Sequence, residues 1–370
     1  MLENVTIRNT VQFHWLKIVK KKRLTKTSFS LTFEIPEHLK EKFQYESGQY
    51  SAIKLGNRQN DYSYTSAPYE NELSFGIKYS NEESFAYHLY KSLEPGDVVE
   101  ISEPQGRFTI RSRPNEKRTI LCFASGIGIT PILSHMKNIL HNEANTRLFL
   151  FYGNRDKENI AFIDELSDLQ TQYPDRFHSF FFFSREKAQN LMFQGRLDAK
   201  KVSLIINQIL DQDEEDEEST IWDATDEVLI CGPGEMIKSI ANACYHHGIR
   251  KQNIHFELFD EFNEDIYEIE EELPVVKDIE VKFTLFGQKY EHHIPSNETR
   301  ILSALLEEGF DIPYSCKSGL CGSCRCHLEE GEVYMVENEY LTEKETQSGL
   351  ILPCVGVALS REINLNFDNI

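Results

Sequence analysis

The sequence lacks any apolar run long enough to cross a membrane. Its longest apolar stretches, such as residues 180–183, are far shorter than the roughly 20 residues that a spanning helix needs. The N-terminal residues also lack a basic stretch followed by an apolar core, which is the pattern of a secretory signal. We therefore expect a soluble, cytoplasmic protein that has no membrane partner.

Basic residues are also scarce. The chain contains 39 Lys and Arg against 60 Asp and Glu, which gives a formal net charge of -21. This excess of acid disfavours a nucleic-acid-binding protein, because such proteins present basic surfaces to phosphates.

The acidic residues are concentrated in three regions. Residues 211–227 carry ten acids and no base, and residues 260–278 carry nine acids and one base. We interpret the first region as a solvated loop and the second as an extended linker. Residues 279–370, with fifteen acids and seven bases, favour a basic partner or docking site.

A disulfide framework is missing as well. Of the eight cysteines, four stand singly in apolar or motif contexts, and this is not the pattern of a disulfide-bonded domain. Cys326 is interpreted as a small buried side chain rather than a ligand. These four residues are Cys122, Cys231, Cys244 and Cys326.

The other four cysteines have the spacing Cys-x4-Cys-x2-Cys, followed after 29 residues by the fourth. This is the plant-type arrangement in which four thiolates hold a 2Fe-2S cluster. A zinc ribbon would need two short pairs of ligands, and only Cys321 and Cys324 form such a pair. The sequence therefore predicts a 2Fe-2S cluster with the ligands Cys316, Cys321, Cys324 and Cys354.

Residues 11–112 have the pattern of an antiparallel β domain. Short alternating or apolar runs over residues 28–34, 50–55, 73–78 and 97–101 are separated by Gly and Pro turns. A small barrel is the natural closure of such strands. The basic run over residues 20–23 is interpreted as a solvated strand end, with docking to the acidic C-terminal region as the alternative.

Residues 113–259 alternate between strands and helices, which predicts a parallel α/β sheet. A buried strand over residues 119–124 leads through a glycine turn into a helix that we expect to open at Pro131. Ligands of such sheets bind beyond the carboxyl ends of the strands. The candidate nucleotide contacts there are Gly126, Gly128, Thr130, Pro131, Arg155, Ser184 and Arg185.

Two regions of the chain resemble known families. From about residue 280 to the end, the stretches 312–316 and 352–354 resemble plant-type ferredoxins, which implies a β-grasp domain of the α+β class over residues 279–370. The segment 62–68 resembles the flavin-binding segment of the ferredoxin-NADP reductase family, as do the later turns 128–131 and 231–233. This resemblance implies an FAD-binding β-barrel over residues 11–112, an NADP-binding α/β domain over residues 113–259 and an acidic linker over residues 260–278.

The reductase resemblance implies a flavin site in the barrel. Tyr62 would lie against the isoalloxazine ring of FAD, and Ser63 would reach its N5 edge. Ser84 would cap a helix over the flavin phosphates. The family has an Arg where this chain has Asn60, and the nearest cation is Arg58, so either Arg58 or backbone amides would meet the FAD pyrophosphate.

The same resemblance implies a nicotinamide site. Ser184 and Arg185 would hold the 2'-phosphate, which favours NADPH over NADH. Phe259 would shield the flavin until nicotinamide displaces it. The nicotinamide would be bordered by Cys231, with Gly232 and Pro233 beside it, and Glu257 would lie near the hydride path, so Ser63, Cys231 and Glu257 are the catalytic candidates.

The order of the three domains resembles the reductase components of multicomponent oxygenases, in particular those of the phenylacetyl-CoA epoxidase type. The resemblance implies that electrons pass from NADPH through FAD and the 2Fe-2S cluster to a partner oxygenase or another one-electron acceptor protein. A reductase for a ferredoxin, a flavodoxin or another hydroxylase stays open as an alternative. A non-catalytic redox sensor also stays open, although it would not need the flavin segment.

Overall fold

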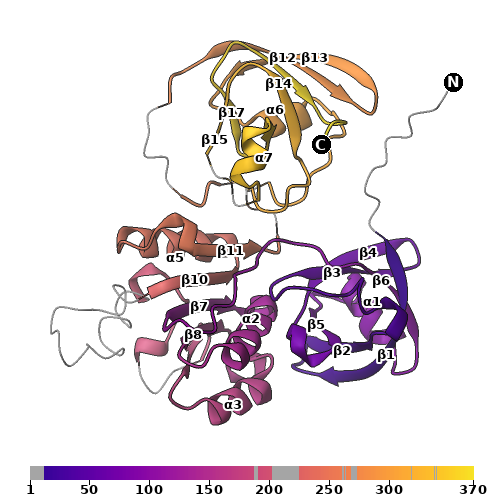
Figure 1. Ribbon diagram of the computed structural model, residues 1–370, viewed down its shortest axis with the longest axis vertical. Helices are drawn as coiled ribbons and strands as arrows, with labels where there is room; N and C mark the ends of the chain where they lie inside the picture. The colour runs from indigo at the N-terminus through magenta and orange to yellow at the C-terminus, as the bar shows by residue number, and fades with distance from the viewer. Residues whose placement is uncertain are drawn as a thin grey trace. The chain divides into compact units, whose positions relative to one another are not determined.

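The computed structural model describes residues 12–186, 191–201, 225–260, 262, 264–267, 273–317, 319–336, 338 and 340–370. Its contacts divide the chain into two compact units, whose strands and helices are labelled in Figure 1. The first unit ends at Gly232 and includes residues 252–254, and the second consists of Pro233–Lys251 and His255–Ile370. None of the helices in the described ranges combines the length and the apolar character that crossing a membrane requires.

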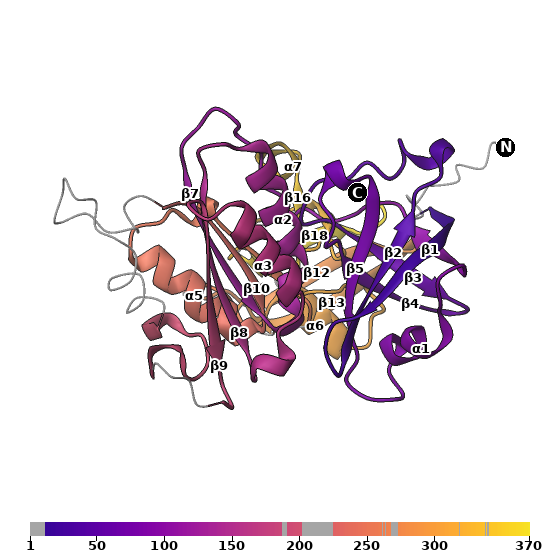
Figure 2. The same cartoon turned by 90° about the horizontal axis from the view of Figure 1, so that it is seen from below.

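The first half of the first unit is an antiparallel barrel of six strands. The strand order is β4-β3-β6-β1-β2-β5, and a bridge between Tyr64 and Phe75 links the two outer strands, so the barrel is nearly closed. Large aromatic residues such as Phe29 and Phe33 fill its core, and helix α1 lies at one end (Figure 2). These elements are β1 (Phe13–Arg23), β2 (Ser28–Glu34), β3 (Tyr50–Leu55), β4 (Arg58–Ser63), β5 (Glu72–Lys78), α1 (Phe85–Ser92) and β6 (Val98–Ser102).

The basic run at residues 20–23 forms the end of β1, where Lys20 and Arg23 are exposed and Lys21 and Lys22 are half-buried. Nζ of Lys21 donates to the carbonyl of Tyr90 at 2.7 Å. Lys22 pairs with Asp164 at 2.9 Å, and this hydrogen bond raises the pKa of the lysine. These cations therefore join β1 to its neighbours inside the first unit, which also weakens the alternative that they dock an acidic module.

The second half of the first unit is a parallel sheet with the strand order β10-β7-β8-β9. Helices α2 and α3 pack on the same side of it (Figure 2). Helix α2 begins before Pro131, which is its third residue, and Pro is tolerated there because the first N–H groups of a helix have no partner within it. These elements are β7 (Thr119–Ser125), α2 (Ile129–Asn142), β8 (Arg147–Asn154), α3 (Ile163–Gln172), β9 (Phe177–Phe183) and β10 (Thr225–Gly232).

The barrel and the parallel sheet meet at the start of α2. A Cβ on Gly76 of β5 would lie 2.5 Å from Cγ2 of Thr130, so glycine is what permits this approach. Oγ of Ser134 donates to the carbonyl of Ser66 at 2.6 Å, just after the end of β4. The strands that carry the predicted flavin segment are therefore packed directly against the helix that follows the predicted nucleotide turn.

The second unit contains α5, most of β11 and a β-grasp domain. The sheet order is β13-β12-β18-β14-β16, in which β12 and β18 run parallel and the other neighbours run antiparallel. A further pair, β15 and β17, is antiparallel, and α6 contributes Ile301, Leu302 and Leu305 to the core. The elements are α5 (Gly234–His246), β11 (Ile254–Leu258), β12 (Lys277–Leu285), β13 (Gln288–Ser296), α6 (Ile301–Glu307), β14 (Cys326–Glu330), β15 (Val333–Met335), α7 (Glu343–Gln347), β16 (Leu350–Ile351), β17 (Gly356–Ala358) and β18 (Glu362–Asn366).

The acidic segments differ from the expected extended chains where the structure describes them. In the segment 260–278, Ile266 is fully buried and Tyr267 is 5% exposed. Lys238 of α5 pairs with Glu264 at 2.8 Å, so this stretch is packed rather than extended. In the segment 211–227, residues 225–227 belong to β10, and residues 211–224 lie outside the described residues.

Candidate functional site

Tyr62 and Ser63 stand at the carboxyl end of β4, as the flavin interpretation requires. Ser63 is 5% exposed and is paired in register with Tyr50 of β3. The hydroxyl of Tyr62 is buried and has no hydrogen-bond partner among the described residues. Burial raises the pKa of Tyr62 to about 12, so the phenol is neutral at physiological pH. A neutral aromatic ring with an unused polar atom fits a planar aromatic ligand that carries hydrogen-bonding groups.

The start of α1 offers a fit for a phosphate. Ser84 is the N-cap, and its Oγ accepts a hydrogen bond from the N–H of Tyr87 at 3.2 Å. The guanidinium of Arg58 lies 5.3 Å from the ring centroid of Phe85, the first residue of the helix. A cation thus stands over the ring of the first residue of a helix, and the N-terminus of a helix attracts anions. Asn60, where the family has its Arg, is exposed on the same strand.

The glycine turn after β7 packs against the end of β10. Gly126 has φ +55, and Oγ1 of Thr130 donates to the carbonyl of Ile127 at 3.0 Å, which closes the turn. A Cβ on Gly128 would lie 2.3 Å from the carbonyl oxygen of Cys231, so any larger residue would separate these strand ends. The two predicted nucleotide turns, at residues 126–131 and 231–233, therefore meet at Gly128.

A cation that the sequence analysis did not identify stands at this turn. Nζ of Lys78, the last residue of β5, lies 3.7 Å from the Cβ position built on Gly126. Desolvation by the surrounding protein atoms, and then the charge of Arg155, hold the pKa of Lys78 below its ordinary value, although the side chain is exposed. Two cations that repel each other next to a glycine turn are stabilised by a bound anion. Only the position of Lys78 at a strand end could have hinted at this role, because the approach of β5 to the turn is a tertiary contact.

Arg155 and Arg185 follow the neighbouring strands β8 and β9. The N–H of Arg185 donates to the carbonyl of Arg155 at 2.9 Å, and the N–H of Ser184 donates to the carbonyl of Asn154 at 3.0 Å. The side chains of Ser184, Arg185 and Arg155 are exposed. They therefore stand together at the carboxyl edge of the sheet, where nucleotides bind in parallel α/β folds.

The remaining reductase candidates lie on either side of the point where the chain divides into its two units. Cys231 is fully buried at the end of β10, and Gly232 is the last residue of that strand. Pro233 is the N-cap of α5, and Glu257 is half-buried in β11. Phe259 is 42% exposed just after β11. The roles of these residues at the flavin and the nicotinamide stay predictions.

The four predicted cluster ligands come together as two pairs. A hydrogen bond from Cys316, and further ones from Ser323, hold the pKa of Cys321 below its ordinary value. Contact with the thiol of Cys324, and then burial, raise the pKa of Cys354. No group of three or more Cys, His, Asp or Glu residues in the described ranges could hold a single metal ion. Two thiol pairs fit a two-iron cluster, in which each iron takes two thiolates and shares two sulfides.

Backbone N–H groups of the loop that carries Cys316, Cys321 and Cys324 also donate hydrogen bonds to cysteine sulfur atoms. The N–H of Leu320 donates to Sγ of Cys316 at 3.4 Å, and the N–H of Cys316 donates to Sγ of Cys321 at 3.5 Å. Such donors stabilise thiolates and a negatively charged cluster. Cys326 is fully buried in the domain core, and burial raises its pKa well above the ordinary value. The position of Cys326 in the core suits a small apolar side chain, and its omission from the ligand set stays a prediction.

Comparisons with known families identify two domains. Residues 123–242 match the oxidoreductase NAD-binding domain. Residues 283–359 match the 2Fe-2S iron-sulfur cluster binding domain. The second match contains all four predicted cluster ligands.

Relatives and solved structures extend the similarity to nearly the whole chain. One of the subunits of 1,2-phenylacetyl-CoA epoxidase from Escherichia coli K12 is 27% identical, over 96% of this chain and 98% of its own length. The ferredoxin reductase component of 3-ketosteroid-9-alpha-monooxygenase from Rhodococcus rhodochrous is 26% identical, over 91% of this chain and 92% of its own length. The fold is shared with phthalate dioxygenase reductase, with a TM-score of 0.53 and 23% identity over 96% of this chain and 98% of that one.

Proposed function

Because the chain is an oxidoreductase that joins an NAD-binding domain to a 2Fe-2S domain, we propose that it is the reductase component of an oxygenase system. It would take electrons from NADPH and pass them through FAD and the cluster to an oxygenase of the phenylacetyl-CoA epoxidase type. The observation that supports this proposal is the presence, in one chain, of cysteines that approach one another in pairs and of the predicted flavin segment, packed against the helix that follows the predicted nucleotide turn. The relatives support the oxygenase partner, since those compared over the whole chain are subunits of an epoxidase and of a monooxygenase.

In this proposal the barrel holds FAD through both ends of the cofactor. Tyr62 would cover the flavin ring, and Ser63 would present its hydroxyl to the reacting edge. Arg58 and the N-terminus of α1 would neutralise the pyrophosphate, with Arg58 in the role that the Arg at position 60 has in the family. When bound, FAD supplies exchange between two-electron and one-electron chemistry, and the cluster supplies one-electron transfer.

The nucleotide would lie along the carboxyl edge of the parallel sheet. Lys78 and Arg155 would meet its pyrophosphate at Gly126, where the repulsion between the two cations is relieved by an anion. Ser184 and Arg185 would take the 2'-phosphate, which supports NADPH over NADH. The contact between Gly128 and Cys231 would bring the nicotinamide end towards β4, because α2 is bonded to the chain just after that strand.

Anaerobic reduction of the purified protein tests this function. NADPH should bleach the flavin absorbance, and the electron paramagnetic resonance signal of a reduced 2Fe-2S cluster should then appear. NADH should be the poorer donor. The reduced protein should transfer electrons faster to the oxygenase component of a phenylacetyl-CoA epoxidase than to a flavodoxin.

Two outcomes would contradict the proposal. A protein that carries the cluster but whose absorbance does not respond to either nucleotide would be a redox sensor rather than a reductase. A preference for flavodoxin over every oxygenase tested would leave the reductase chemistry in place and reject the oxygenase partner.

A further inference from the structure

The loop that carries three of the predicted cluster ligands has a charge opposite to that of its domain. Residues 279–370 contain fifteen acids and seven bases, yet residues 312–328 contain two bases, Lys317 and Arg325, and no acid. Each base lies directly after a predicted ligand, Cys316 or Cys324. The cluster is therefore approached through a locally basic surface on an acidic domain.

Lys317 is paired with an exposed aromatic ring. Its Nζ lies 4.6 Å from the ring centroid of Tyr314, whose side chain is 40% exposed. The residue has φ +57, a left-handed conformation that costs energy for any residue with a Cβ. Tyr314 is thus an exposed aromatic surface with a cation over its face, which is a stabilising arrangement.

Arg325 is paired with a second tyrosine. Nη1 of Arg325 lies 3.4 Å from the hydroxyl of Tyr340 and 3.4 Å from the carbonyl oxygen of Gly322, to both of which it can donate. A Cβ on Gly322 would lie 2.1 Å from Cε1 of Tyr340, so the tyrosine ring covers the backbone of the loop between Cys321 and Cys324. Gly322 has φ +64, which also favours glycine. Both the ring and the cation are therefore fixed by contacts with the cysteine loop itself.

We propose that these two tyrosine–cation pairs, Tyr314 with Lys317 and Tyr340 with Arg325, form the surface through which the cluster gives electrons to its acceptor protein. The acceptor's matching patch is rich in carboxylates. This inference rests on the proposed function and names the chemistry of the partner. One electron leaves the domain and reduces the acceptor, and no covalent bond is made or broken.

Three observations support this surface and its occupant. Cys321 is only half-buried and Ser323 is exposed, so the loop is the part of the predicted ligand set that solvent and a partner can approach. Aromatic residues and Arg are enriched at protein interfaces, where they combine a large contact area with directional bonds. Cations on an otherwise acidic domain repel a basic partner locally and attract carboxylates, and such steering acts mainly on the association rate.

Small charged oxidants measure the charge at this surface directly. The full-length protein is reduced with dithionite and mixed with ferricyanide, a trianion, or with hexaamminecobalt(III), a trication. Decay of the cluster's electron paramagnetic resonance signal gives the rate at several salt concentrations. The rate with ferricyanide should fall as salt rises, and the rate with hexaamminecobalt(III) should rise, although the net charge of -21 predicts the opposite for both.

A matched pair of double variants identifies the cations responsible. The double variant Lys317→Gln with Arg325→Gln should lower the low-salt rate with ferricyanide by about threefold to tenfold. Lys289→Gln with Lys344→Gln removes the same charge from exposed positions elsewhere in the domain and should change this rate by less than about twofold. Arg325→Lys keeps the charge and should stay near the wild-type rate. If Arg325→Gln lowers cluster content, Lys317→Gln alone still tests the surface.

Four results would overturn the inference. The first is a wild-type rate with ferricyanide that rises with salt, because the whole-domain charge would then dominate. The second is an equal loss in both double variants. The third is a double variant Lys317→Gln with Arg325→Gln in which transfer from flavin to cluster is slower and oxidation by ferricyanide is unchanged. The surface would then receive electrons from the flavin domain of this chain instead of passing them to an acceptor. The fourth is a rate with ferricyanide that neither double variant changes, because the two cations would then not set the potential at the cluster. Absence of any 2Fe-2S signal after dithionite would instead reject the proposed function.

Discussion

At the scale of single residues, the proposed function depends on a few polar side chains that lie at the ends of strands. Arg155 and Arg185 are exposed, and their backbones are joined by a hydrogen bond of 2.9 Å. The neighbouring Lys157 is already paired with Glu186 at 3.5 Å. Arg185 is therefore the better placed of these side chains to meet an additional phosphate, because a guanidinium binds phosphate through two parallel hydrogen bonds.

Replacing Arg185 with Gln should weaken the use of NADPH and leave the use of NADH almost unchanged. The lost charge-assisted contact is worth roughly 1.5 to 3 kcal/mol, which corresponds to about a tenfold to 150-fold loss in kcat/KM. Steady-state kinetics with both nucleotides measure this change. Lys157→Gln, on the same edge of the sheet, should change kcat/KM by less than about twofold with either nucleotide. A wild-type enzyme that uses NADH as efficiently as NADPH would refute the assignment of Arg185.

The sequence predicts the role of a residue best where that role depends on a fixed spacing between neighbouring positions of the chain. The four cysteines can be predicted as ligands because chelation by one loop requires a fixed separation, and the structure brings these thiols together in pairs. Lys78 was missed for the converse reason: it reaches Gly126 only because Gly76 lets β5 approach α2. The surface formed by Arg325 and Tyr340 was missed in the same way, since these residues meet across the cysteine loop.

At the scale of elements, the sequence pattern predicts the strands better than it predicts the start of helix α2 or the packing of the acidic segment. The expected strands at residues 28–34 and 50–55 coincide with β2 and β3, because Gly and Pro turns mark their ends. The start of α2 was placed two residues late, because the first turn of a helix leaves no signature when it follows a glycine turn directly. The segment around Ile266 was expected to be an extended linker from its charge, but its few apolar residues are buried.

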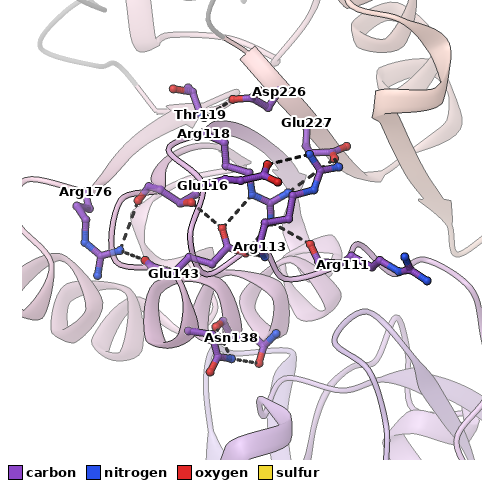
Figure 3. A network of polar contacts seen from close by, with 12 residues as sticks. Arg111, Arg113, Glu116, Arg118, Thr119, Asn138, Glu143, Arg176, Asp226 and Glu227 are labelled. Carbon is purple, nitrogen blue, oxygen red and sulfur yellow. Dashed lines mark hydrogen bonds and ion pairs between the residues drawn. The ribbon is translucent and has the colours of Figure 1, made fainter.

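The amino ends of the parallel strands are joined by a buried ion-pair network (Figure 3). Glu143, the C-cap of α2, accepts hydrogen bonds from Nη2 and Nε of Arg118 at 2.6 and 2.9 Å. Thr146 donates to the same carboxylate at 2.6 Å, and Arg176 donates to the carbonyl of Glu143 at 2.5 Å. Glu143 and Arg118 are both buried, so neither charge could lose its partner without a large cost.

Glu143→Gln should destabilise the first unit by about 3 to 5 kcal/mol at pH 7, because Arg118 would keep a buried charge without its carboxylate. Burial alone would raise the pKa of Glu143, but the bonds from Arg118, Thr146 and the N–H of Arg113 hold it below the ordinary value. A depressed carboxyl pKa adds stability above the unfolded-state pKa of about 4.3, and this stability is lost as the pH falls through the folded-state value.

The difference in the free energy of unfolding between wild type and Glu143→Gln should therefore shrink below about pH 4.3. Urea unfolding followed by circular dichroism at pH 7, 5 and 3 measures it. Glu116→Gln is the control, since this exposed carboxylate contacts Arg113 at 3.3 Å and its loss should cost less than about 1 kcal/mol. A difference that is the same at pH 7 and pH 3 would mean that packing, and not charge, accounts for the effect.

At the scale of the whole molecule, the predicted flavin segment and the predicted cluster ligands lie in different units, while the predicted nicotinamide residues fall in both. The flavin segment and the glycine turn belong to the first unit, and all four predicted cluster ligands belong to the second. The order of these modules could be predicted from the sequence, because each module has its own local motif. The contact of Arg325 with Tyr340 could not, because the two residues lie 15 positions apart in the chain and meet only in the folded domain.

This separation predicts that the cluster can be removed without loss of the nucleotide reaction. Cys324→Ala takes one thiolate from the pair with Cys354 and leaves that iron with a single protein ligand, so the variant should lose the electron paramagnetic resonance signal of the cluster. Delivery of electrons to a protein acceptor should fall by at least about a hundredfold, since the route through the cluster is gone. Reduction of the flavin by NADPH, followed by stopped flow, should stay within about twofold of wild type, because Cys324 belongs to the second unit and the predicted flavin segment to the first.

Cys326→Ala is the matched control for that experiment, because it changes a cysteine two residues away that lies fully buried in the same domain core. If Cys326 serves only as a small apolar side chain, the variant should keep the cluster signal and lose little stability, since Ala fills nearly the same space. Loss of the cluster from Cys326→Ala with the fold intact would place Cys326 among the ligands. Slow flavin reduction in Cys324→Ala would be equally informative, because it would mean that the two units work as one catalytic body and that the nucleotide reaction depends on a loaded cluster domain.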